Sequence, residues 1–135
     1  MTSDPQPAAT SGAGDDPRRI VVVGPCASGK TTLVAALRAR GYDARVSGQE
    51  HSVVSYLWRL SEPDVVVALA ADLDAVRARR GEHWPAWLLE LQLERLRDAV
   101  AAADVRIDTS RLDAEEVRGE VLAFLKGERE QREEA

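Results

Sequence analysis

The chain has 135 residues, which is enough for one domain with a modest hydrophobic core and too few for a second. Its formal net charge of −5 argues against a protein that binds nucleic acid through a basic surface. No apolar run approaches the roughly 18–20 residues that cross a bilayer, and the single cysteine cannot form an internal disulfide. We therefore expect a cytoplasmic protein with no membrane partner.

The two ends of the chain differ in composition from the rest. Residues 1–17 are rich in small and polar residues and cannot bury enough apolar surface to order themselves, so we expect a disordered tail. Residues 127–135 are nearly all charged or small, and we expect them to fray from the last helix. The predicted folded domain spans residues 18–126.

The first predicted elements enclose a glycine-rich loop. Residues 20–23 form an unbroken β-branched run, typical of a strand buried on both faces of a parallel sheet. Residues 30–40 carry apolar side chains at helical spacing before Gly41, a predicted helix C-terminal cap. Between them, residues 24–31 fit the phosphate-binding pattern G-x-x-x-x-G-K-[ST] at every fixed position.

The pattern assigns a role to each position of this loop. Glycine at positions 24 and 29 permits backbone conformations and a close approach that a Cβ would obstruct. The amides of residues 27–30 are expected to converge on phosphate at the helix N-terminus, with Lys30 bridging the β- and γ-phosphates and the Thr31 hydroxyl binding Mg²⁺. The predicted nucleotide-binding residues are Gly24, Pro25, Cys26, Ala27, Ser28, Gly29, Lys30, Thr31 and Thr32.

A cysteine within a phosphate loop raises a second interpretation. Phosphatases with a thiolate nucleophile use a C-x5-R loop, but the sixth residue after Cys26 is Thr32, so the arginine that clamps phosphate is missing. We interpret Cys26 as a small loop residue. A pKa lowered by the helix terminus stays an alternative.

Three further elements follow before the middle of the chain. Residues 44–47 form a short second strand. Residues 52–60 place Val53, Val54, Leu57 and Trp58 on one helical face, and Pro63 ends this predicted helix. Residues 65–69 are a second fully apolar run and form the third strand.

The second half predicts three helices and one strand. A polar helix after Asp72 is broken by Gly81. A long helix begins at Pro85 and is followed by a fourth strand at residues 105–107. The last helix opens at Asp113, with Glu116 three residues on as a capping box. The predicted inner stripe of the long helix is Trp84, Leu88, Leu91, Arg95, Ala99 and Ala103.

Strands that alternate with helices imply a parallel sheet covered on both faces. Ligands in such folds bind at the carboxyl ends of the strands. Residues 24–31, 48–51, 70–72 and 108–110 are therefore expected to gather on one edge.

With these motifs the chain resembles the P-loop kinases of nucleotides and small molecules, such as shikimate, gluconate and adenylate kinases. Residues 67–80 are similar to their strand, helix and arginine-bearing lid entry, and residues 103–110 to their last strand and the loop beside the adenine. The element Gln-Glu-His-Ser at residues 49–52 also resembles that of bacterial P-loop proteins. The resemblance implies a three-layer αβα P-loop NTPase fold with a reduced sheet of about four parallel strands.

The chain departs from these kinases in three respects. They have about five parallel strands, whereas four are found here. A Walker B aspartate directly at the end of an apolar strand is missing, because Asp72 lies past the third strand and Asp108 ends the short fourth. The lid segment is short.

Glu50 is the best substitute acid, because it follows the second strand where a substrate would lie and could bind Mg²⁺ through water or accept a proton. An exposed turn with an incidental charge is an equal alternative for Glu50. Arg77 and Arg80 are candidates for stabilising the transferred phosphoryl group, whereas Arg79 is expected to point elsewhere. The alternative for Arg77 and Arg80 is that they form part of a solvent-exposed basic face without a functional role. Trp87 is expected in the core.

These residues predict a protein that binds ATP and Mg²⁺ and transfers the γ-phosphoryl group to a small-molecule acceptor, with Lys30, Glu50, Arg77 and Arg80 as catalytic residues. The alternative is a nucleotide-dependent switch or binding module without such an acceptor. No nucleic acid partner is expected.

Overall fold

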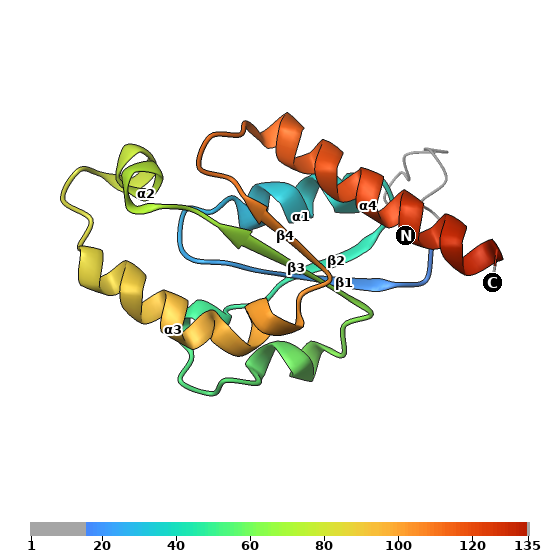
Figure 1. Ribbon diagram of the computed structural model, residues 1–135, viewed down its shortest axis with the longest axis horizontal. Helices are drawn as coiled ribbons and strands as arrows, with labels where there is room; N and C mark the ends of the chain where they lie inside the picture. Colours follow the sequence, from blue (N-terminus) through green and yellow to red (C-terminus); the bar gives the residue numbers. More distant parts are fainter. Residues whose placement is uncertain (1–15, 135) are drawn as a thin grey trace, which may run out of the picture.

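The computed structural model describes residues 16–134, with side chains from 16 to 131. The expected disordered tail lies outside the described residues except for positions 16 and 17. Four strands form one all-parallel sheet in the order β2-β1-β3-β4, and helices cover both of its faces (Figure 1). The strands are β1 (Arg19–Val23), β2 (Asp43–Val46), β3 (Val65–Ala70) and β4 (Val105–Asp108).

The composition of each strand explains its place in the sheet. β1 and β3 lie in the centre, and their near-continuous apolar runs are buried on both faces. β2 and β4 lie at the edges, and their sequences Asp-Ala-Arg-Val and Val-Arg-Ile-Asp carry polar side chains that reach solvent. The predicted α/β class and the four-stranded parallel sheet are therefore confirmed.

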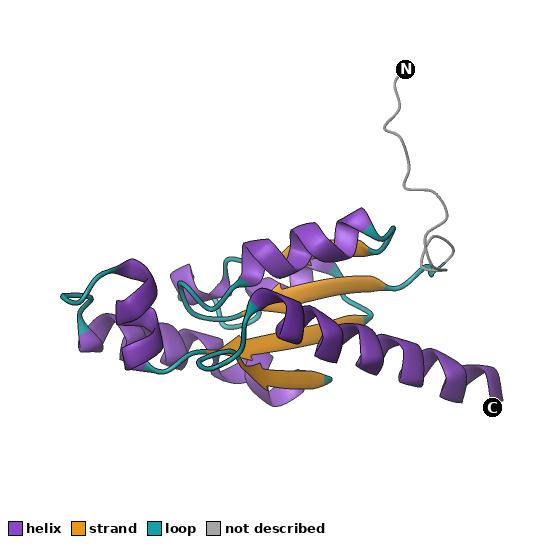
Figure 2. Ribbon diagram, turned by 90° about the horizontal axis from the view of Figure 1, so that it is seen from above, coloured by secondary structure: helices purple, strands orange, loops and turns teal. Residues whose placement is uncertain are grey.

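Alternate residues of the two central strands face two separate cores. Ile20, Val22 and Val67 pack against α1 (Lys30–Ala39) and α4 (Ala114–Glu134) on one face. Val21 and Val66 pack against α3 (Ala86–Ala102) and the 3-10 helix η3 (Leu57–Ser61) on the other. The short helix α2 (Leu73–Arg80) lies beyond the carboxyl end of β3, at one end of the molecule (Figure 2).

Local sequence sets both ends of the helices that flank the sheet. After α1, the amides of Gly41 and Tyr42 donate to the carbonyls of Arg38 and Leu37, which is a Schellman motif with Gly41 at φ 90°. Before α4, Asp113 and Glu116 exchange side-chain-to-backbone hydrogen bonds of 2.8 and 2.9 Å. The predicted glycine cap and capping box are confirmed.

The predicted helix over residues 52–60 is wrong. After η2 (Gln49–His51), residues 52–56 form turns and residues 57–60 belong to the 3-10 helix η3, and Val53 is 82% exposed. Its ordered part depends on Trp58, which is buried, and on Gln49, whose side chain accepts from the Trp58 amide and donates to the Val54 carbonyl. Side-chain hydrogen bonds of Gln49, rather than an apolar stripe, set this conformation.

The predicted inner stripe of α3 is also shifted. The buried positions are Leu89, Gln92, Leu96 and Ala99, whereas Leu91 is exposed. Trp87 is 65% exposed, so its predicted place in the core is wrong. The shift follows from a glutamine on the buried face, which the apolar pattern leaves out.

The helix α4 continues through the range expected to fray. It runs to Glu134 and extends past the end of the sheet, beside the start of β1 (Figures 1 and 2). Arg18 holds the two together, because its guanidinium donates to Glu128 at 2.7 Å, to the Leu125 carbonyl at 3.0 Å and to Asp16 at 2.7 Å. Asp16, expected in the tail, is buried in this network.

Candidate functional site

The glycine-rich loop leaves the central strand β1 and enters α1 at the carboxyl edge of the sheet. Gly24 sits where no side chain fits, since a Cβ there would lie 2.6 Å from the Ser28 hydroxyl and 2.8 Å from the Leu69 carbonyl oxygen. Gly29 has φ +99° and Ala27 has φ 66°. Left-handed residues on either side of Ser28 turn successive amides toward one side of the loop, which is the geometry of an anion-binding nest.

The amides of this loop divide into two groups. The Cys26 amide donates to the Gln92 side chain at 2.9 Å, and the Ser28 amide donates to the Pro25 carbonyl at 3.2 Å. The amides of Ala27, Gly29 and Lys30 have no hydrogen-bond acceptor within residues 16–134. Three of the four amides predicted to bind phosphate can therefore donate to a ligand.

Lys30 lies under the loop rather than in solvent. Its ammonium donates to the carbonyls of Gly24 and Pro25 at 2.8 and 3.0 Å, and it pairs with the Glu50 carboxylate at 2.9 Å. The side chains of both charged residues are less than one-tenth exposed. Glu50 thus holds the Lys30 ammonium close to the unpaired amides of the loop.

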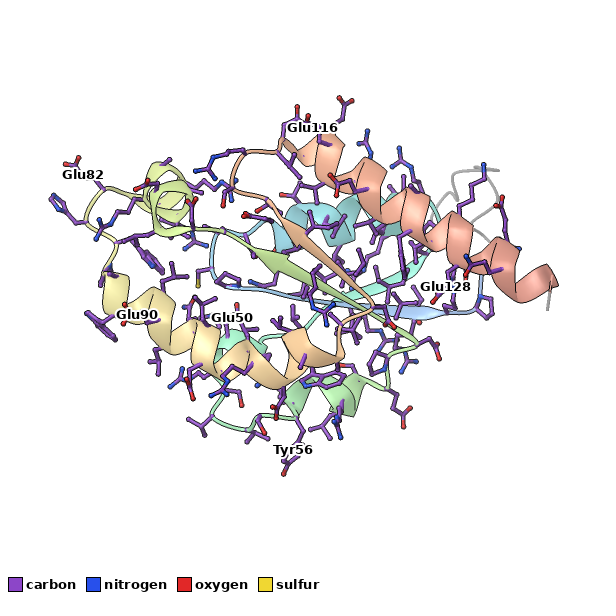
Figure 3. All side chains as sticks on the ribbon, in the orientation of Figure 1. Glu50, Tyr56, Glu82, Glu90, Glu116 and Glu128 are labelled. Atoms are coloured by element: carbon purple, nitrogen blue, oxygen red, sulfur yellow. The ribbon has the colours of Figure 1, made fainter. Side chains whose placement is uncertain are left out.

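Glu50 owes its position to its neighbour in η2. Gln49 is fully buried and donates to the carbonyl of Arg95 on α3 at 3.1 Å, which fixes η2 against that helix. Figure 3 places Glu82, Glu116 and Tyr56 at the periphery of the molecule and Glu50 beside α3. Glu50 is 4% exposed, so the alternative of an exposed turn is wrong, and its Oε1 atom has no hydrogen-bond partner among the described residues.

The arginines of α2 lie differently from the prediction. Arg79, expected to point away, donates to the Ala27 carbonyl at 2.7 Å and to the Thr109 carbonyl at 2.6 Å. Arg80 lines a cavity beside the loop and lies over the Trp84 ring. Arg77 donates to the Trp84 carbonyl at 2.9 Å and does not join the site. The structure therefore brings Arg79 and Arg80 to the loop and leaves Arg77 outside.

The loop after β4 also contacts the glycine-rich loop, through Thr109. Thr109 is buried, and its hydroxyl donates to the Ser28 carbonyl at 3.0 Å. Its amide donates to the Ala70 carbonyl at the end of β3. Thr109 thus links three segments of the carboxyl edge, which residues 108–110 were expected to share.

The two aspartates near the expected Walker B position serve local structure. Asp72 caps α2 by accepting from the Ala75 amide and pairs with Arg111 at 2.9 Å, and these contacts lower the pKa of its carboxyl. Hydrogen bonds from the hydroxyl and the amide of Ser110 lower the pKa of Asp108. Both carboxylates are engaged away from Lys30.

Two cavities flank the loop. One, of about 340 Å³, lies between the loop and the start of α4 and is lined by Thr32, Thr109 and Leu112 among others. The other, of about 480 Å³, lies toward β2 and η2 and is lined by Lys30, Thr31 and Glu50 among others. Ala27, Gly29, Thr32 and Arg79 line both cavities.

Cys26 lies where the second cavity meets α3. Its sulfur accepts from the Gln92 side-chain amide at 3.2 Å and lies 3.9 Å from His51 Nε2. His51 in turn lies 3.4 Å from the Glu50 carboxylate. Cys26, Glu50 and His51 therefore converge from two segments of the chain.

Two contact residues of the site were missed by the sequence interpretation, Arg79 and Gln92, whereas Thr109 lies in residues 108–110, which were expected at this edge. Gln92 carried a readable signal, because a glutamine among Leu89, Leu96 and Ala99 at helical spacing breaks an otherwise apolar face. Arg79 carried none, because its contacts depend on how α2 folds back over the glycine-rich loop.

Comparisons with protein-family models and with curated proteins found no match to this chain. None of the helices in residues 16–134 combines the length and the apolar character that a membrane crossing demands.

Proposed function

We propose that this chain binds ATP and Mg²⁺ at residues 24–32 and transfers the γ-phosphoryl group to a small-molecule acceptor. The observation that supports the proposal best is the loop itself, with a buried lysine beside three unpartnered amides. A strand, a glycine-rich loop and a helix in a parallel sheet are the required context for this motif. We accordingly propose a three-layer P-loop NTPase fold of reduced size.

The residues present fit a nucleotide with its cation. Gly24 provides a cradle that a Cβ would fill, and the amides of Ala27, Gly29 and Lys30 supply donors for an anion at the start of α1. Thr31 is exposed and lines the larger cavity, where its hydroxyl is available as a cation ligand. Mg²⁺, when bound, neutralises charge on the phosphate oxygens.

The two cavities offer room for the two ends of the reaction. The cavity lined by Thr109 and Leu112 suits the nucleoside, because it adjoins the loop that resembles the adenine loop of the kinases named above. The cavity lined by Glu50, Thr31 and Arg80 suits the acceptor. There Glu50 could accept the proton of an acceptor hydroxyl, and Arg80 could donate to phosphate oxygens.

A specific observation favours the alternative of a nucleotide-dependent switch. Lys30 is already neutralised by Glu50, and neither Asp72 nor Asp108 is free to act as a Walker B acid. A ligand that draws Lys30 away from Glu50 would leave the Glu50 carboxylate without its partner and change the surface beside η2. A partner protein could recognise that change without any phosphoryl transfer.

Titration calorimetry with ATP, ADP and GTP, with and without Mg²⁺, tests nucleotide binding. We expect ATP to bind the natural chain and to lose at least tenfold in affinity with Lys30→Ala, since the variant removes the charge next to the amides. Lys126→Ala is the matched control, because Lys126 is the other lysine of the chain and is exposed on α4. Unchanged binding by Lys30→Ala would overturn the proposal.

Lys30→Ala also leaves Glu50 buried without its partner, so the variant needs a folding control. The double variant Lys30→Ala/Glu50→Gln removes both charges and should recover most of the thermal stability lost by the single variant. Its ATP affinity should stay low. A metabolite screen then separates the two functions, because a kinase consumes ATP faster with one acceptor and a switch responds only to a protein partner.

A further inference from the structure

We propose that Cys26, His51 and Glu50 form a binding site for a soft divalent cation, with zinc as the ion of best fit. The three residues come from the glycine-rich loop after β1 and from η2 after β2, two segments that leave neighbouring strands of the sheet at its carboxyl edge. Their sulfur, nitrogen and oxygen atoms all lie within 4.8 Å of one another. This proposal does not rest on nucleotide binding.

The distances suit one small tetrahedral ion. With about 2.3 Å from zinc to sulfur and about 2.0–2.2 Å to nitrogen and oxygen, tetrahedral ligands lie about 3.4–3.6 Å apart. His51 Nε2 lies 3.9 Å from the Cys26 sulfur and 3.4 Å from Glu50 Oε2, the carboxylate oxygen that also pairs with Lys30. All separations within the cluster are below 4.8 Å, so a bound ion would draw its ligand atoms together by about 1.4 Å at most, and the exposed His51 side chain has room to move.

A buried glutamine positions the cysteine. Gln92 is 2% exposed, and its side chain accepts from the Cys26 amide at 2.9 Å while it donates to the Cys26 sulfur at 3.2 Å. This pair of bonds fixes both the backbone and the sulfur of one residue. The bond from Gln92 orients the sulfur, as residues behind a metal ligand do.

A second buried group also points to a ligand. Glu50 has a side chain only 5% exposed, and its Oε1 atom has no hydrogen-bond partner among the described residues. Lys30 engages the other oxygen, Oε2. A buried carboxylate oxygen without a donor is costly, and a cation would satisfy it.

The donor set distinguishes this ion from Mg²⁺. Mg²⁺ prefers oxygen ligands in octahedral geometry, whereas a thiolate, an imidazole and a carboxylate suit zinc. The thiolate and the carboxylate offset the charge of the ion in part, because Glu50 also pairs with Lys30. Three protein ligands leave a fourth position open toward the larger cavity, in which Cys26, Glu50 and His51 all take part.

Cobalt is the probe for the first experiment, since Co²⁺ replaces zinc and reports its ligands by absorption. Titration of the full chain with Co²⁺ should produce a thiolate-to-cobalt charge-transfer band at one ion per chain, and Zn²⁺ should abolish it. Cys26→Ser removes the only thiol and should abolish the band. No band in the natural chain, or an unchanged band in Cys26→Ser, would overturn the proposal.

The two histidines of the chain allow a matched comparison. His51→Gln should weaken Co²⁺ binding at least tenfold, whereas His83→Gln should leave it unchanged, because His83 is exposed and paired only with Glu82. Gln92→Leu should keep the band but lower affinity about 10–100-fold, as expected for a residue that positions a ligand. Equal effects of the two histidine variants would contradict the site.

A thiol-labelling experiment guards against a variant that fails to fold. In the natural chain, Zn²⁺ should slow the reaction of Cys26 with a thiol reagent, and a chelator should restore the rate. An unchanged rate with saturating Zn²⁺ would overturn the proposal. Neither measurement uses ATP, so a failure of this site and a failure of nucleotide binding are distinguishable.

Discussion

Arg79 is the side chain that ties the glycine-rich loop to the rest of the carboxyl edge. It holds the carbonyls of Ala27 and Thr109, so one guanidinium fixes two loops at once. Ala27 has a left-handed backbone, a conformation that needs support from its surroundings. The contact therefore preserves the arrangement of unpartnered amides on which anion binding depends.

Arg79→Ala should reduce the affinity for ATP about tenfold. A hydrogen bond to a charged group is worth about 1.5–3 kcal/mol, and we expect a value near the lower limit because Arg79 is exposed. A loss of about 1.4 kcal/mol corresponds to a tenfold loss of affinity. Arg77→Ala is the matched control and should change the affinity less than twofold, because Arg77 contacts the Trp84 carbonyl. Titration calorimetry measures both. Equal losses would show that the position of Arg79 is irrelevant.

The residues of the candidate site differ in how far local sequence determines their roles. The phosphate pattern identifies Gly24, Gly29 and Lys30, because their roles depend on the local backbone. It assigns Arg77 and misses Arg79, because the choice among neighbouring arginines depends on how α2 packs. Long polar side chains reach in several directions, and only the tertiary fold selects one.

At the scale of elements, α4 begins where its own sequence dictates. Asp113 and Glu116 satisfy two amides of the first turn, and Leu112 packs with Val117 in the core below. The start of this helix forms one wall of the 340 Å³ cavity. A local capping motif thus shapes the candidate nucleoside pocket.

Asp113→Ala should lower the free energy of unfolding by about 1 kcal/mol, since it removes the N-cap hydrogen bond to the Glu116 amide. Glu120→Ala, at an exposed position further along α4, should change it by less than about 0.5 kcal/mol. Urea denaturation followed by circular dichroism measures both values. A loss as large in Glu120→Ala would contradict the capping role.

Elements with a long apolar run or a capping motif were predictable from the sequence, whereas the conformation of residues 52–60 was not. The apolar runs of β1 and β3 and the caps of α1 and α4 were all readable from sequence. Residues 52–60 were not, because their apolar spacing matches a helix while Gln49 captures the Trp58 amide and the Val54 carbonyl instead. Side-chain bonds from outside a segment override its periodicity.

At the scale of the whole molecule, an ion-pair network joins the first described residues to the last turns of α4. Burial opposes ionisation of Asp16, but hydrogen bonds from the Arg18 side chain and amide, together with the Arg18 charge, lower the pKa of its carboxyl. Glu128 adds a third charge at 2.7 Å from Arg18. The network closes the amino edge of the sheet, at the opposite end of β1 from the candidate site.

This network should make stability depend on pH in the acid range. The folded pKa of Asp16 lies below its ordinary value of 3.8, so its contribution is complete above that value and is lost as the pH falls through the folded pKa. Asp16→Asn should cost about 2 kcal/mol at pH 7, and the difference from the natural chain should shrink below about pH 4. Urea denaturation across pH 2–7 measures it. A difference independent of pH would contradict the ion pair.

The two cavities share one wall, made by Ala27, Gly29, Thr32 and Arg79. Any occupant that shifts this wall alters the free energy of filling the opposite side. Thermodynamic reciprocity then requires that the factor by which one ligand changes the affinity of a second equals the factor by which the second changes the first. Because of this shared wall, we expect the two cavities to bind their ligands with coupled affinities.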